Sequence, residues 1–284
     1  METAKIDILC KISYNKSTYV YKEIFYMNAT MVLQRHQNWV KSNFELTPRV
    51  ISKMQHVRNV FELSTDIAKI ENMDQEGIFI AQVIAALHDI GRFPQIQRYN
   101  TFIDDERYNH SIEGAKMLQE GFLQQLLPET REYDEIVITA VKYHGLKDLP
   151  TEEVSKRTMT HVKLIRDADR IDLFERSTNQ FETMFSTIGL GKSKRITPEI
   201  KRLFADRQSI SVKDLRSKID LLTLRLGLIG QYEFLSALKL IEKKDYINRL
   251  TQLFLERTDY DPEEIMWLRE KAKEQLNLRK KELN

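Results

Sequence analysis

Residues 78–93, IFIAQVIAALHDIGRF, form an apolar run that ends in His88, Asp89 and Arg92. Side chains three, four and seven residues apart share one face of a helix. The residues that share the face of His88 in this way are all apolar: Ala81, Ile84 and Ala85. The run therefore predicts a helix whose last turn points the His88 imidazole toward the protein interior.

The composition favours an all-α fold. The chain has 284 residues, of which 42% are apolar and 30% charged, and it holds only nine glycines and six prolines. So few chain-breaking residues over this length favour long helices. Periodicity and helix-start signals place the candidate helices at 28–44, 49–70, 75–90, 110–126, 132–144, 152–175, 197–206, 211–229, 231–242, 244–257 and 261–281.

Three parts are expected along the chain. Residues 1–27, rich in β-branched and aromatic side chains, predict a short non-helical N-terminal arm. Residues 28–188 form the predicted helical core, and 195–284 an additional C-terminal helical region. The stretch Gly189–Lys194, GLGKSK, lacks the spacing of a phosphate-binding loop and is interpreted as a linker.

Charge and cysteine content exclude several classes of function. The net charge of +2 gives no reason to expect nucleic acid or an acidic membrane surface as the main partner. Cys10 is the only cysteine, which excludes a disulfide framework and a zinc site made of cysteines. There is no apolar run of 18 residues and no secretory leader pattern, so a cytoplasmic protein is expected. Scattered Leu and Tyr in the C-terminal region are compatible with a homodimer.

Two later residues also face inward by the helical test. His144 and Asp169 each have apolar residues on their face, whereas Asp167 aligns with polar residues and is expected at the surface. The apolar neighbours are Val137, Ala140 and Val141 for His144, and Val162, Ile165 and Leu173 for Asp169. A buried carboxylate costs several kcal/mol unless it is paired or binds a metal. Histidines and an aspartate that converge from separate helices would satisfy each other by sharing a metal ion.

Each residue also has a plainer interpretation. A single inward histidine is more often a hydrogen-bonded core residue than a ligand. His56 has a mixed face, and His110 stands at a predicted helix start, where it could simply be exposed. His36 and His161 have no neighbouring carboxylate in the sequence and are interpreted as packing or surface residues.

Taken in order, these residues resemble the signature of the HD superfamily of metal-dependent phosphohydrolases. The ordered set is His56, His88, Asp89, His110, His144 and Asp169, and it is similar to the branch with two extra histidines between the HD pair and the last aspartate. The stretches LHDIGRF, HSIEGA and RDADRID add to the resemblance, which covers about residues 50–175. It implies an HD-domain helical bundle as the core of the fold.

The resemblance implies a centre with two metal ions. The first ion would be held by His56, His88, Asp89 and Asp169, and the second by Asp89, His110 and His144. A nitrogen and oxygen ligand set without thiolate suits divalent Fe, Mn, Co, Ni or Zn.

The activity implied is hydrolysis of a phosphomonoester or phosphodiester, with a nucleotide as the expected substrate and a metal-bridging hydroxide as nucleophile. Asp89 would bridge the two ions. Arg92, one turn beyond, would stabilise the charge on the phosphoryl oxygens in the transition state. The alternative for Arg92 is a cation that interacts with the dipole of a helix end.

Two other functions fit the same ligands. One is an oxygenase with a di-iron centre, similar to myo-inositol oxygenase, in which the metals activate O₂. The other is a regulatory module that senses a nucleotide and uses the C-terminal helices as an interface.

Overall fold

The computed structural model describes residues 29–150, 154–186 and 193–284. Regular secondary structure in these ranges is helical throughout, and the one β contact is an isolated bridge between Asp105 and Tyr108. The predicted all-α class is therefore confirmed. The non-helical arm predicted for 1–27 lies outside the described residues.

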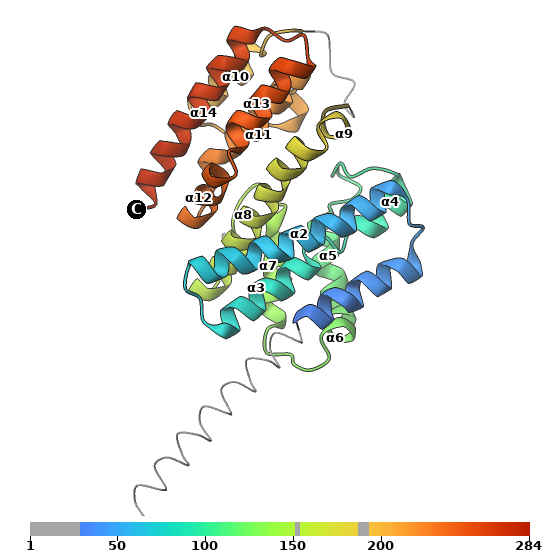
Figure 1. The fold of residues 1–284 in the computed structure, drawn as a ribbon. Coiled ribbons are helices and arrows are strands. Elements are labelled where there is room, and N and C mark those ends of the chain that lie inside the picture. The colour runs from blue at the N-terminus through green and yellow to red at the C-terminus, as the bar shows by residue number, and fades with distance from the viewer. Residues whose placement is uncertain (1–28, 151–153, 187–192) are drawn as a thin grey trace, which may run out of the picture. The chain divides into compact units, whose positions relative to one another are not determined.

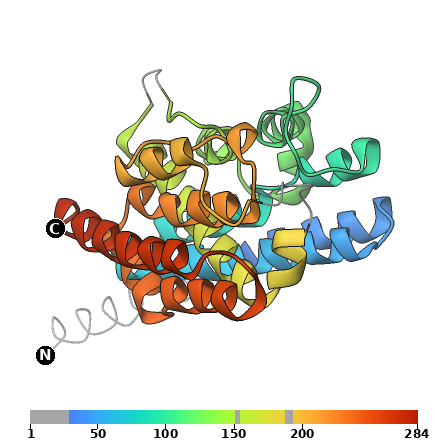
Figure 2. The ribbon, with the colours of Figure 1, turned by 90° about the horizontal axis from the view of Figure 1, so that it is seen from above.

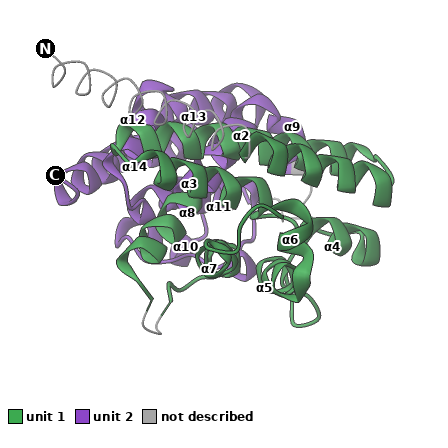
Figure 3. Cartoon of the chain, turned by 90° about the horizontal axis from the view of Figure 1, so that it is seen from below, with its two compact units in different colours: residues 1–165 green, residues 166–284 purple. Residues whose placement is uncertain are grey.

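The chain packs as two compact units, residues 1–165 and 166–284, which Figure 3 shows in different colours. The division falls inside α8, a helix that begins in the first unit and ends in the second. The linker predicted at Gly189–Lys194 lies mostly outside the described residues, and the three-part division stays a prediction.

Unit 1 holds the residues of the HD-like signature up to His144. Its first helix covers residues 29–43, and the other elements follow in the order drawn in Figure 1. They are α2 (Pro48–Ile70), α3 (Gln75–Leu87), α4 (Arg92–Tyr99), α5 (His110–Met117), the π turn η1 (Leu118–Phe122), α6 (Leu123–Leu126), α7 (Asp134–His144) and the first part of α8 (Lys156–Asn179).

Unit 2 contains the rest of α8 and the C-terminal helices. They are α9 (Phe181–Ser186), α10 (Pro198–Ala205), η2 (Val212–Asp214), α11 (Lys218–Gly227), η3 (Leu228–Gln231), α12 (Leu235–Lys243), α13 (Tyr246–Arg257) and α14 (Pro262–Glu282). The last two lie side by side (Figures 1 and 2). In the described part of the chain, every helix is too short or too polar to cross a membrane.

Local sequence signals explain where several helices begin. Thr47 caps α2 through its hydroxyl, which accepts from the Val50 N–H, and Pro48 occupies the first helical position. Asp74 caps α3, where its carboxylate accepts the Gly77 N–H at 2.7 Å. Asn109 caps α5, the helix that begins with His110. Among these three caps, that of Asn109 fixes a helix end at which a histidine, His110, stands.

The segment 91–109, which lies between the helices predicted at 75–90 and 110–126, is partly helical. Its first half is α4. Phe93 and Ile96 are buried on one side of this short helix, and Asn100 ends it in the left-handed conformation. Few apolar residues mark the stretch, so its helical character depends on packing that a single sequence does not reveal.

The core of unit 1 forms where α2 packs against α3 and α5 against α7. Val57 and Val60 on α2, Ile80 on α3, and Val137 and Val141 on α7 are fully or almost fully buried. Burial of such side chains stabilises a domain by about 1.5–3 kcal/mol each. This packing holds in place the ends of α3, α5 and α7, where His88, His110 and His144 lie.

Gly91 is the point at which the turn after α3 touches the start of α5. A Cβ atom added there would lie 2.1 Å from the His110 carbonyl oxygen and 2.9 Å from the Gly114 nitrogen. The Tyr108 hydroxyl also donates to the Gly91 carbonyl at 2.8 Å. Only glycine therefore permits this close approach, which sets the distance between the His88–Asp89 turn and His110.

We expect Gly91→Ala to destabilise the protein by at least about 2 kcal/mol, because the added methyl would displace backbone. Urea unfolding followed by circular dichroism measures the change. Gly230→Ala is the matched control: its Cβ would meet Arg207 Nε only at 3.8 Å, an ordinary contact. Equal midpoints for Gly91→Ala and the wild type would contradict the close approach.

Candidate metal centre

Four imidazoles surround the carboxylate of Asp89. Asp89 Oδ2 lies 3.0 Å from His56 Nε2 and 3.4 Å from His88 Nε2. The other oxygen, Oδ1, lies 3.4 Å from His110 Nε2 and 3.7 Å from His144 Nε2. All five residues are buried. Within unit 1 the structure thus brings together His56, His88, Asp89, His110 and His144, all predicted as ligands, and divides the histidines into two pairs, one on each oxygen.

Each histidine stands on a different helix of unit 1. His56 lies in α2, His88 caps the C-terminus of α3, His110 begins α5 and His144 ends α7. Gly145 directly follows α7, and a Cβ there would lie 2.7 Å from His110 Cε1. Because Gly145 has only a hydrogen as its side chain, the end of α7 can approach the start of α5 closely.

Hydrogen bonds fix the tautomers of three of these rings. His88 Nδ1 donates to the Ala85 carbonyl at 2.8 Å, and His144 Nδ1 donates to the Val141 carbonyl at 2.7 Å. His110 Nδ1 donates to Asp104 Oδ2 at 2.7 Å. In a neutral imidazole the second nitrogen then carries a lone pair. Each ring therefore presents its Nε2 lone pair to the centre.

This donor arrangement fits a metal ion. His110 Nε2 and His144 Nε2 are 3.1 Å apart, and a neutral imidazole whose Nδ1 donates to a carboxylate or carbonyl has no proton at Nε2. Two facing lone pairs repel unless a cation lies between or beside them. Metal-bound histidines usually donate their other nitrogen to a carboxylate or a backbone carbonyl, which is the arrangement seen here. The ligand atoms of His88, Asp89 and His144 also lie within 4.8 Å of one another.

Two cationic side chains approach Asp89. Lys53 Nζ is 2.6 Å from Asp89 Oδ2, and the ammonium lies 5.5 Å from the centre of the Phe102 ring. Arg92 Nε is 3.5 Å from Asp89 Oδ1, and Arg92 Nη1 donates to Asp104 Oδ1 at 3.0 Å. The centre therefore combines a buried anion with positive charge at its edge.

The protonation states agree with a cation site. Burial alone would raise the pKa of Asp89, but the Lys53 ammonium beside it holds this pKa well below its ordinary value. Burial lowers the pKa of His88, and it lowers that of His110 to about 3 with help from Arg92. Burial alone would raise the pKa of Asp104, but the hydrogen bonds from His110 and the charges of His110 and Arg92 together lower it to about 2. At neutral pH the carboxylates are ionised, and His88 and His110 are neutral and able to bind metal.

The two aspartates compared in the sequence analysis both lie on the part of α8 that belongs to unit 2. Asp169 is partly buried, and its role as a ligand stays a prediction. The surface position expected for Asp167 is wrong, since this side chain is fully buried. Its Oδ2 accepts the backbone N–H groups of Glu233 and Phe234, each at 2.9 Å. Burial raises the pKa of Asp167 to about 7.

The two remaining histidines are packing residues. His36 is buried, with its ring 5.4 Å from that of Phe93 and 6.0 Å from that of Trp39. Burial lowers its pKa to about 4, so it is neutral at neutral pH. His161 is buried as well, and burial lowers its pKa to about 4. The structure gives neither histidine a position among the four that surround Asp89.

The sequence analysis missed Lys53 and Asp104. Lys53 precedes His56 by three residues, so the helical repeat places both on one face of α2. The helical repeat could therefore have indicated Lys53, but a lysine is usually exposed to solvent, so this position was not interpreted as part of a site. Asp104 lies in the irregular chain between α4 and α5, where no periodicity indicates which way a side chain points. Its role depends on a tertiary contact with His110.

Comparison with protein families supports the resemblance. Residues 54–173 match the family model described as HD domain, a range that includes all six predicted ligands. The match supports the HD superfamily and, with it, divalent metal binding. Comparisons with curated proteins and with solved structures found no match.

We expect Asp104→Asn to weaken metal binding about 10–100-fold, because Asp104 holds the His110 ring and fixes its tautomer. A chelator competition titration with Mn²⁺ or Zn²⁺ measures this change. Asp105→Asn is the matched control, since that neighbouring carboxylate pairs with Arg107 at the surface. Equal affinities for the two variants would show that the Asp104–His110 contact does not orient a ligand.

Proposed function

We propose that this protein is a metal-dependent phosphohydrolase that cleaves a phosphomonoester or phosphodiester, with a nucleotide as the substrate. The observation that carries the proposal is Asp89, whose two oxygens each face a different pair of imidazoles. The HD-domain match supports a phosphohydrolase-type protein. The arrangement of six ligands and the nucleotide substrate go beyond this match and are proposed here.

Two ions would share the Asp89 carboxylate. His56 and His88 would bind the first ion, with Asp169 as the further ligand that the order of the signature predicts. His110 and His144 would bind the second. The donors are nitrogen and oxygen, so we expect Fe, Mn, Co, Ni or Zn. When bound, such ions polarise a phosphoryl oxygen and lower the pKa of water to near neutrality.

The protein's own residues prepare the centre for that chemistry. Ala85, Val141 and Asp104 hold three rings with their lone pairs inward, so the ligands need little reorganisation when metal binds. Asp89 stays ionised because the neighbouring Lys53 ammonium stabilises the charged form. The protein's own hydrogen bonds and charges thus hold the ligand atoms in the orientation and protonation state that metal binding requires.

The cations beside Asp89 favour an anionic substrate. Lys53 Nζ and Arg92 Nε lie 2.6 and 3.5 Å from the carboxylate oxygens. At the edge of the centre, these two cations would be in position to bind phosphate oxygens of a substrate. A buried ammonium or guanidinium binds a phosphate group strongly through charge-assisted hydrogen bonds. This feature favours phosphoester hydrolysis over oxygenation of a neutral substrate.

We expect the metal-loaded protein to release phosphate or a nucleoside monophosphate from a panel of nucleotides and cyclic nucleotides. The panel is run with Mn²⁺, Fe²⁺, Co²⁺, Ni²⁺ or Zn²⁺ under strict anaerobiosis. Asp89→Asn should lower kcat/KM at least about 100-fold, because it removes the charge shared by both ions. Elemental analysis should give about two metal equivalents per chain for the wild type.

Asp66→Asn, at an exposed position of α2, is the control for loss of one carboxylate and should keep full activity. Turnover that requires O₂ would instead identify an oxygenase. Nucleotide binding without turnover, in protein shown to contain both metals, would identify a sensing module and contradict the proposed hydrolase.

We expect Lys53→Met to raise KM for the best nucleotide about tenfold, because the ammonium contacts the phosphate rather than the metal. Metal affinity should be unchanged or higher, since the variant removes a cation that competes for Asp89. Steady-state kinetics and chelator titration separate these effects. Lys69→Met, at the exposed end of the same helix, should change neither quantity. A fall in metal affinity without a rise in KM would assign Lys53 to support of the ligands.

A further inference from the structure

Unit 2 contains a buried arginine whose charge no carboxylate in the described residues neutralises. Arg225, on α11, is 7% exposed. Its guanidinium donates to the Ser177 hydroxyl and, at 3.3 Å, to the Met184 carbonyl, and it lies 4.6 Å from the centre of the Phe185 ring. Arg225 Nε is buried without a hydrogen-bond partner. These contacts are a hydroxyl, a carbonyl and an aromatic face, none of which carries negative charge.

A second arginine adds to the positive charge. Arg176, on α8, is partly buried and contacts the Met184 sulfur through Nη2 at 3.7 Å. Its Nε atom is buried and has no hydrogen-bond partner among the described residues. Both guanidiniums thus reach Met184 from neighbouring helices. Burial and the nearby Arg176 charge lower the pKa of Arg225 to about 9, and no acidic group in the described part of the chain raises it. The next stretch of sequence, TIGLGK at 187–192, contains no acidic residue either.

Such a pair of charges is costly for the protein alone. A buried, unpaired ion destabilises a fold by several kcal/mol. A lysine or histidine can reduce this cost by releasing its proton, whereas arginine stays charged in proteins. The Nε–H groups of Arg176 and Arg225 would therefore be stabilised by an anion that does not belong to the described residues.

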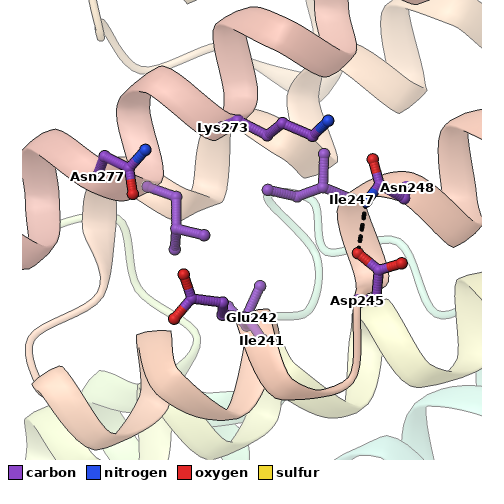
Figure 4. Close-up of a pocket in the computed structure, with 8 residues that line it drawn as sticks. Ile241, Glu242, Asp245, Ile247, Asn248, Lys273 and Asn277 are labelled. Atoms are coloured by element: carbon purple, nitrogen blue, oxygen red, sulfur yellow. Dashed lines mark hydrogen bonds between the residues drawn. The ribbon is translucent and has the colours of Figure 1, made fainter.

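The cleft between α12, α13 and α14 offers a useful contrast. It has a volume of about 240 Å³ and is lined by Ile241, Glu242, Asp245, Ile247, Asn248, Lys273, Leu276 and Asn277 (Figure 4). Its charged groups have partners among the described residues: Glu242 pairs with Lys280, Asp245 accepts from Asn248, and Lys273 pairs with Glu270. The charged groups of this cleft are therefore neutralised within the described residues, whereas the charges of Arg176 and Arg225 are not.

We propose that Arg176 and Arg225 form a binding site for a phosphate group in unit 2, separate from the metal centre of unit 1. Two guanidiniums balance the charge of a phosphate dianion, and their planar N–H groups match the spacing of its oxygens. The ligand is either inorganic phosphate or the phosphate of a nucleotide. Binding at this position stabilises the packing of α8, α9 and α11, which share the contacts of the two arginines.

The test measures thermal unfolding of the full-length, metal-free protein while inorganic phosphate is varied at constant ionic strength with NaCl. A ligand that binds the folded state alone raises the unfolding midpoint in a saturable way. We expect this rise for the wild type, and an apparent dissociation constant about tenfold higher for Arg176→Gln. Arg225→Lys, which keeps the charge and loses the planar fork, should also weaken binding. Broadening of the ³¹P resonance of phosphate reports the same binding directly.

Arg202→Gln is the matched control, because this exposed arginine of unit 2 already pairs with Glu199. It should bind phosphate as the wild type does. Lys53→Met tests whether phosphate binds at the metal centre instead. Loss of the phosphate effect in Lys53→Met, together with an unchanged effect in Arg176→Gln, would overturn the proposal. So would a midpoint that phosphate does not raise.

Adenosine monophosphate in place of inorganic phosphate distinguishes the two sources of the ligand. Tighter binding of the nucleotide that still depends on Arg176 assigns the site to a nucleotide. Equal affinity assigns it to phosphate alone. Because the protein is metal-free throughout, the outcome does not depend on whether the proposed hydrolase activity is found.

Discussion

The buried Asp89 carboxylate imposes the main constraint on unit 1. An ionised carboxylate in a protein interior needs cations or hydrogen-bond donors close by, and the four surrounding imidazoles offer lone pairs at several of those positions. In the structure Lys53 meets the need with an ammonium at 2.6 Å. The converging helix ends and the close approach at Gly91 serve to place this one charge among its neighbours.

The groups behind the histidines matter as much as the histidines. An imidazole can rotate and can carry its proton on either nitrogen, so four rings near a carboxylate do not by themselves form a metal site. The carbonyls of Ala85 and Val141 and the carboxylate of Asp104 remove this freedom for three rings. They belong to the same helix ends as the rings they orient, or to the chain just before α5. The fold therefore sets the chemistry of the centre through local backbone geometry.

Helical periodicity was sufficient to predict the inward direction of His88 and His144, because both lie on helices whose buried faces are uniformly apolar. It failed for Asp167, since the backbone of Glu233 and Phe234 covers that side of α8 with hydrogen-bond donors. A contact between residues more than 60 positions apart leaves no trace in the local pattern. Asp104 was missed for the same reason, and α4 because its apolar face consists of very few residues.

Two buried ionisable residues of unit 2, Asp167 and Arg225, differ in whether the described protein stabilises their charge. Asp167 receives two backbone N–H groups, and its raised pKa shows that it can also take up a proton near neutrality. Arg225 has neither remedy: arginine does not release its proton at such pH values, and the described chain offers it no anion. The buried Asp167 can thus be explained within the protein, whereas the buried Arg225 and the partly buried Arg176 favour a negatively charged ligand from outside the described chain. This asymmetry is why we place a binding site at Arg176 and Arg225 and none at Asp167.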